Sequence, residues 1–161
     1  MRVIGIDPGT AITGWGIVEG SGSELQMVAV GTITTAAGTP LPERLQIIYH
    51  ELTAIIEQWQ PSTAAIEELF FSKNAKTALA VGHGRGVAML ALANADLSIT
   101  EYKPLEVKQA ITGHGGADKK QMQQMVKLLL ALDDIPRPDD AADALAIAIC
   151  HLHSARLRLL E

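Results

Sequence analysis

The sequence predicts an α/β protein in which helices flank a five-stranded sheet of mixed direction. Three strand-like apolar runs follow one another in the first 35 residues, whereas helical and strand-like segments alternate after them. The first arrangement favours antiparallel pairing and the second favours parallel pairing, so we expect both in one sheet. The 161 residues contain no internal repeat, low-complexity tract or linker. We therefore expect residues 1–161 to form a single domain.

The three N-terminal strands are delimited by turn signals. The apolar run at residues 2–7 ends at a Pro-Gly pair, and a Gly-Ser-Gly-Ser sequence divides the runs at 13–19 and 24–35. Such short apolar runs bounded by glycine, proline and serine are typical of strands joined by tight turns.

The rest of the chain alternates between helix and strand. Apolar residues recur at helical spacing over about 41–60, where a proline ends the pattern. The run TAAIE at 63–67 predicts a fourth, buried strand. A helix is expected over 75–95 and the fifth strand over 97–102, and the remainder is helical in character.

Composition excludes a membrane protein and a disulfide scaffold. Hydrophobic residues make up 48% of the chain and charged residues 19%, and no apolar run is long enough to span a bilayer. The lone cysteine, Cys150, lies in an apolar segment and can form neither an internal disulfide nor a CxxC metal site. We expect a cytoplasmic protein with no membrane partner.

Charge is distributed unevenly along the chain. The net charge is −5, but residues 73–127 hold eight basic residues against four acids, which gives +4 there and −9 elsewhere. A protein polarised in this way can hold a polyanion on its basic side. Random variation in surface charge explains the pattern equally well, so charge alone does not decide whether the protein binds a polyanion.

The segment PDDAADALAIAI predicts a buried helix with an acidic first turn. No polar side chain occurs over 144–150, as in a core helix. Capping accounts for Asp139, because acids favour a helix N-terminus. It accounts poorly for Asp143, which borders the buried run, where an unpaired carboxylate is costly.

Four carboxylates are expected to converge. Asp7 and Glu67 each end an apolar strand, and ligands bind beyond the carboxyl ends of strands in open α/β sheets. Each acid also has a purely structural explanation. Asp7 suits the first position of a β-turn, and Glu67 suits the end of a strand that emerges into water. Asp140 and Asp143 share one helical face.

Four such groups repel one another unless a cation neutralises them, and oxygen-only ligands suit Mg²⁺, with Mn²⁺ able to substitute. Two ions about 3.5–4 Å apart can drive hydrolysis of a phosphodiester.

Two acidic doublets leave a choice of ligand. Glu67 and Glu68 point to opposite sides of their strand, so only one of them faces the site. Asp139 and Asp140 are both spaced to share a face with Asp143. We favour Asp140 as the ligand and assign Asp139 to cap the helix.

Five motifs extend over essentially the full chain, namely GIDPGTAITGWGIVE, AIEELFFSKNAKTAL, GRGVA, EYKPLEVKQAITGHGGADKKQMQQMV and DDAADALAIAI. In order and spacing they resemble the RuvC family of bacterial Holliday junction resolvases, the crossover junction endodeoxyribonucleases. The resemblance implies an RNase H-like fold, a homodimer and divalent-metal cleavage of two opposed strands at a four-way DNA junction. It also implies a role in recombination and repair alongside the branch-migration complex RuvA-RuvB.

The resemblance also implies roles for particular residues. The family's four acids fall on Asp7, Glu67, Asp140 and Asp143, and its DNA-contacting lysines fall on Lys108 and Lys119. Its phenylalanine falls on Phe70, which can stack on an unpaired base or pack in the core instead. From their positions we further expect DNA contacts from Lys73, Lys76, Arg85 and Lys120.

Other functions fit less of the sequence. Another RNase H-like nuclease would share the metal site, and only the family motifs separate it from a resolvase. GIDPGT also resembles the first phosphate loop of actin-like ATPases, but those proteins need a second domain and a second phosphate loop. A non-catalytic junction-binding module would not gather four acids, because bare carboxylates repel phosphate.

Overall fold

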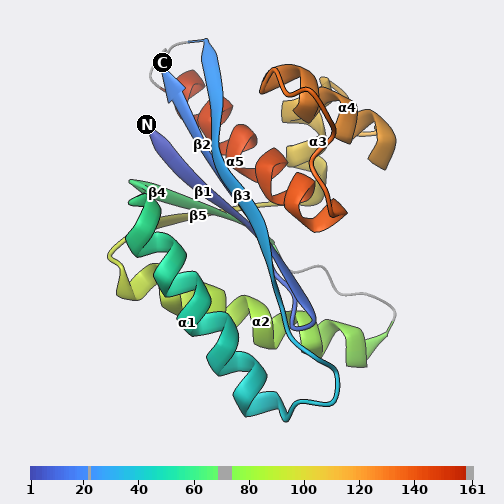
Figure 1. The fold of residues 1–161 in the computed structure, drawn as a ribbon. Coiled ribbons are helices and arrows are strands. Elements are labelled where there is room, and N and C mark those ends of the chain that lie inside the picture. Colours follow the sequence, from blue (N-terminus) through green and yellow to red (C-terminus); the bar gives the residue numbers. More distant parts are fainter. Residues whose placement is uncertain (22, 69–73, 159–161) are drawn as a thin grey trace.

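The computed structural model describes residues 1–21, 23–68 and 74–158, which contain one five-stranded sheet and five helices (Figure 1). The strands are β1 (Arg2–Asp7), β2 (Ile12–Ser21), β3 (Glu24–Thr34), β4 (Thr63–Glu67) and β5 (Ser98–Tyr102). Their order is β3-β2-β1-β4-β5, with β1, β2 and β3 antiparallel and β1, β4 and β5 parallel. The predicted mixed sheet is therefore confirmed.

The helices are α1 (Leu41–Trp59), α2 (Ala75–Asn94), α3 (Pro104–Thr112), α4 (Lys119–Leu129) and α5 (Asp139–Arg158). Helix α1 ends at Trp59, and its C-cap residue Gln60, which precedes Pro61, has a left-handed backbone (φ 49°). Helix α4 begins with a capping box, in which Asp118 accepts from the Gln121 backbone and Gln121 accepts from the Asp118 backbone. Sequence-based boundaries lie within two residues of the observed ones for β1 to β5, α1 and α2.

The two faces of the sheet carry different helices. Alternation along β1 sends Ile4 and Ile6 into the core formed with α1 and α2, and Val3 into the core formed with α3, α4 and α5. Figure 1 shows α1 and α2 on one side of the sheet and α5 on the other, with α3 and α4 beside it. Cys150 is buried in the second core, as its apolar surroundings in the sequence predicted.

Helix α5 lies unusually close to β1 and β2, because glycines line the face beneath it. A Cβ built on Gly5 would stand 2.2 Å from the carbonyl oxygen of Ala144 and 2.7 Å from the backbone nitrogen of Ala148. A Cβ on Gly16 would stand 2.7 Å from a methyl carbon of Leu145. These approaches leave no room for a side chain, so the helix backbone rests directly on the sheet.

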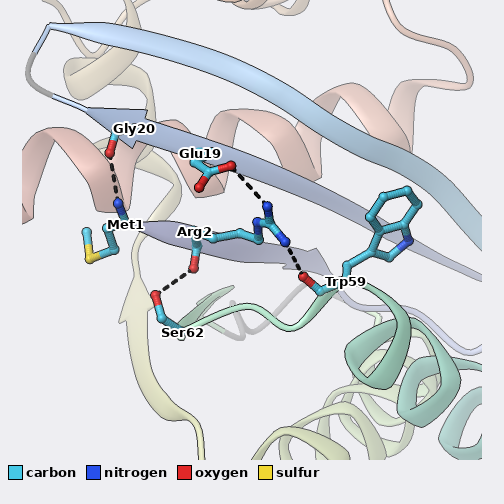
Figure 2. Close-up of polar contacts among 6 residues, drawn as sticks. All are labelled: Met1, Arg2, Glu19, Gly20, Trp59 and Ser62. Atoms are coloured by element: carbon cyan, nitrogen blue, oxygen red, sulfur yellow. Dashed lines mark hydrogen bonds and ion pairs between the residues drawn. The ribbon is translucent and has the colours of Figure 1, made fainter.

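The end of the sheet remote from Asp7 is fixed by polar contacts of the first two residues (Figure 2). The amino group of Met1 donates to the Gly20 carbonyl at 2.8 Å. The Arg2 guanidinium donates to the Trp59 carbonyl at 2.7 Å and pairs with Glu19 at 3.1 Å. These bonds tie β1 to the end of α1 and to β2.

Among the residues that the structure describes, no helix combines the length and apolar character needed to cross a bilayer.

The glycine contact yields a stability prediction. Gly5→Ala should lower the free energy of unfolding by about 1–3 kcal/mol or more, because its methyl group meets helix backbone rather than a side chain that can move. Urea denaturation of the metal-free protein measures this change.

Gly86→Ala is the matched control. Gly86 lies exposed in α2, and a Cβ there meets nothing within 4 Å. This substitution should raise the free energy of unfolding by about 0.5–1 kcal/mol, since alanine is the better helix former. Equal effects of the two substitutions would contradict the close packing of α5.

Candidate active site

Asp7 and Glu67 end neighbouring parallel strands on the same face of the sheet. The register pairs Ile6 of β1 with Ile66 of β4, so the two acids follow directly after paired residues. Ala65, two residues before Glu67, belongs to the core that contains α5. Because side chains alternate along a strand, both carboxylates emerge on the α5 face.

The first turn of α5 is held beside Asp7 by Gly14. Gly14 is the register partner of Asp7, and a Cβ there would lie 2.0 Å from the carbonyl oxygen of Asp140. The backbone of Asp140 therefore rests on β2 at the level of Asp7. Asp143 lies one helical turn further along α5, and both side chains are partly buried.

The four carboxylates form one electrostatic cluster. Burial, followed by the charges of Asp143, Glu67 and Asp140, raises the pKa of Asp7 from 3.8 to about 8. Burial, followed by the charge of Asp143, raises the pKa of Glu67. Burial raises the pKa of Asp143 as well, and Asp140 adds to that increase. Asp7, Glu67 and Asp143 are thus costly to ionise without a compensating positive charge.

The donor set suits a hard divalent cation. All four groups offer oxygen, and a cation relieves both their burial and their mutual repulsion. A cavity of about 220 Å³ opens at Asp7 and Glu67, and it is lined by Asp7, Pro8, Glu67, Glu68, Val81, Arg85 and Pro104. Within the described residues, no three His, Cys, Asp or Glu side chains stand close enough together to hold a metal as placed. To hold a metal together, the carboxylates would have to change their side-chain conformation.

Asp139 lies in the first turn of α5, where the sequence predicted an acid that favours a helix N-terminus. It is the first residue of α5, and its carboxylate binds side chains of α4. One oxygen accepts from Nε2 of Gln123 at 3.0 Å, and the other pairs with Nζ of Lys119 at 3.0 Å. The hydrogen bonds from Lys119 and Gln123 lower the pKa of Asp139. Asp139 is exposed, whereas Asp140 is partly buried against the sheet.

Two of the expected DNA-contacting lysines lie at the rim of the acidic cluster. The charge of Lys119 in α4 lowers the pKa of Asp7, and the charge of Lys108 in α3 lowers the pKa of Glu67. Lys120 in α4 and Lys76 in α2 are exposed. Phe70 and Lys73 lie outside the described residues.

Arg85 is engaged by protein groups and faces the strand that carries Glu67. Its Nε donates to the Glu67 carbonyl at 3.3 Å, and its Nη2 pairs with Glu101 of β5. Only 15% of its side chain is exposed. The DNA contact expected of Arg85 stays a prediction, and its pairing with Glu101 was not expected from the sequence. An acid inside the otherwise uncharged strand SITEY was the available signal.

Helix α2 approaches the β1–β2 turn through Gly84. A Cβ on Gly84 would lie 2.7 Å from both the carbonyl carbon and the carbonyl oxygen of Gly9. The hydroxyl of Thr10 donates to the Ala80 carbonyl across the same contact. These contacts fix the turn that follows Asp7.

The sheet order, the helices on both faces and the carboxylates at adjoining strand ends define an RNase H-like protein with a nuclease-type acidic site. The chain belongs to the RuvC family: the family model described as crossover junction endodeoxyribonuclease RuvC matches residues 3–151. The predicted family and fold are thereby confirmed.

Relatives of this family match nearly the whole chain. Crossover junction endodeoxyribonuclease RuvC of Chloroflexus aggregans is 64% identical over 155 residues, which cover 96% of this chain and 94% of the relative. That of Desulfitobacterium hafniense is 55% identical and covers 98% and 95%.

Solved structures agree with the fold. T. thermophilus RuvC in complex with a Holliday junction substrate superposes with a TM-score of 0.94 at 35% identity, covering 98% of this chain and 96% of that one. The yeast mitochondrial Holliday junction resolvase Ydc2 has a TM-score of 0.69 at 15% identity, covers 98% and 82%, and shares the fold.

The raised pKa of Asp7 predicts how stability depends on pH in the absence of metal. The folded state binds a proton at Asp7 up to about pH 8, whereas the unfolded state loses it near 3.8. Between these values the folded state holds more protons, so stability falls as pH rises.

Asp7→Asn should remove this penalty. With EDTA present, it should raise the melting temperature of the protein more at pH 9 than at pH 5, as measured by differential scanning calorimetry. A gain of the same size at both pH values would show that burial and repulsion do not act on this carboxylate.

Proposed function

We propose that this chain resolves four-way DNA junctions by hydrolysing a phosphodiester in each of two opposed strands. The observation that carries the proposal is the cluster of Asp7, Glu67, Asp140 and Asp143 on the α5 face. Membership of the crossover junction endodeoxyribonuclease family supports the reaction. The likeness to T. thermophilus RuvC, whose structure contains a Holliday junction, supports the substrate.

The family is metal-dependent, and in this chain the four carboxylates would hold the metal. We propose two Mg²⁺ ions, replaceable by Mn²⁺, because the donors are oxygen only and number four. Bound there, such ions would lower the pKa of a water molecule and would stabilise the leaving oxygen. The protein holds the first turn of α5 against Gly14, and it places Asp7 and Glu67 at the ends of two parallel strands.

Basic side chains around the cluster would hold the DNA. Lys108 and Lys119 lie near enough to lower carboxylate pKa values, so they can contact phosphates next to the scissile bond. Lys76 and Lys120 are exposed and can contact phosphates further along the arms. Stacking by Phe70 and a phosphate contact by Lys73 remain predictions from the sequence.

Arg85 would act through Glu67. Its guanidinium bonds the Glu67 carbonyl and the Glu101 side chain, so it fixes the end of β4 where the Glu67 carboxylate emerges. We therefore propose a positioning role for Arg85 in addition to the DNA contact expected from the sequence.

A two-fold symmetric dimer would match the substrate. A junction presents two equivalent scissile bonds in strands of like polarity, and a C₂ pair of sites has the same symmetry. We propose a homodimer of single nuclease domains, each formed by residues 1–161, that acts in the cytoplasm together with RuvA-RuvB.

Neutralising any one of the four acids should abolish most cleavage. Asp7→Asn, Glu67→Gln, Asp140→Asn and Asp143→Asn each remove a charged oxygen ligand, and a loss of about 10²-fold or more is expected. Junction binding should persist or tighten, because a charge that repels phosphate is lost. Gel analysis of a labelled four-way junction with Mg²⁺ measures both.

Asp134→Asn is the matched control, since Asp134 is an exposed acid in the loop before α5. It should cleave like the unsubstituted protein. Cleavage of an RNA–DNA hybrid without cleavage of the junction would identify a different RNase H-like nuclease. Full activity of Asp140→Asn with loss in Asp139→Asn would reverse the assignment of ligand.

A further inference from the structure

The Asp139 carboxylate joins the first turn of α4 to the first residue of α5. Its two oxygens have different partners, the Lys119 ammonium and the Gln123 amide, each at 3.0 Å. Lys119 and Gln123 are four residues apart, so they lie on one face of α4. Asp139 is therefore held by two bonds, which fix the orientation of its carboxylate.

The bond to Asp139 sets Lys119 beside the acidic cluster. The charge of Lys119 acts on Asp7 and on Asp143, which belong to different elements. An ammonium group has three donor hydrogens, and Asp139 takes one of them. Within the described part of the chain the other two have no acceptor, so they can serve a further acceptor next to the cluster, where a scissile phosphate would lie.

Without Asp139, Lys119 would have little to hold it in place. More than half of its side chain is exposed (56%), and lysine has a flexible four-carbon stem. Ordering such a side chain before DNA binds reduces the cost of ordering it at the reacting centre. The place of Asp139 at the start of α5 favours its charged form, because the helix dipole is positive there.

We propose that Asp139 is a positioning residue, which holds Lys119 at the edge of the carboxylate cluster with its free donors available to the phosphate that is cleaved. The inference rests on the proposed junction cleavage. The opposite effect of the same contact would be competition, in which Asp139 keeps Lys119 away from DNA. The two differ in the sign of their effect on the rate.

The direct test is Asp139→Asn, which has nearly the same shape and retains an oxygen for Gln123. At saturating junction and Mg²⁺, the single-turnover cleavage rate should fall about three- to tenfold, as expected for a misplaced reacting group, with Kd changed less than about twofold. In a Lys119→Ala background the substitution should have no further effect. Asp133→Asn, which removes an exposed acid before α5, should leave the rate unchanged.

A second measurement needs neither metal nor DNA. The ¹⁵N–¹H signal of the Lys119 ammonium should be observable by NMR at low temperature, because its bond to Asp139 slows proton exchange. Asp139→Asn should abolish this signal, and Asp133→Asn should preserve it.

The outcomes separate the two proposals. Failure of the unsubstituted protein to cleave junctions, with the NMR signal present, would overturn the proposed function and with it the role of Asp139 in cleavage. Normal junction cleavage by Asp139→Asn would overturn the positioning role alone. Tighter binding with a faster rate, or an equal loss in the Lys119→Ala background, would also overturn it.

Discussion

The close contact between α5 and the glycine-lined face of β1 and β2 is the constraint on which the site depends. At Gly5 and Gly14 the helix backbone occupies the space where a Cβ would stand. A helix seated on backbone has little freedom to slide or tilt, because close-packed interiors resist displacement. The buried run that follows Asp143 fixes the depth of the helix, and the glycines fix its distance from the sheet. Asp140 therefore meets Asp7 without any bond between their side chains.

This packing brings together charges that repel one another. The repulsion is clearest at Asp7, whose pKa is raised to about 8 by burial and by three neighbouring acids. The apolar contacts of α5 offset that cost in the folded protein. A cation at this site would be stabilised, because it would remove the repulsion that folding imposes on the carboxylates. Lys108 and Lys119 supply part of the compensation from the rim.

The sequence predicted those features that follow from local pattern. The bounds of β1 and β4 follow from apolar runs. Strand alternation left Glu67 and Glu68 as alternatives, and the family motif selected Glu67. The contacts of Asp139 with Lys119, and of Arg85 with Glu101, depend on how elements distant in sequence lie against each other. For that reason neither contact was expected from the sequence. The contact of Gly84 in α2 with the turn at Gly9 depends on such long-range packing as well.

The most direct test compares Mn²⁺ affinity in Gly14→Ala and Gly16→Ala by isothermal titration calorimetry. A methyl group at Gly14 meets the Asp140 backbone, whereas one at Gly16 first meets the movable end of the Leu145 side chain. Both variants should be less stable than the unsubstituted protein, but only Gly14→Ala should bind Mn²⁺ more weakly, by about tenfold or more. Equal Mn²⁺ affinity in the two folded variants would contradict the claim that this contact builds the site.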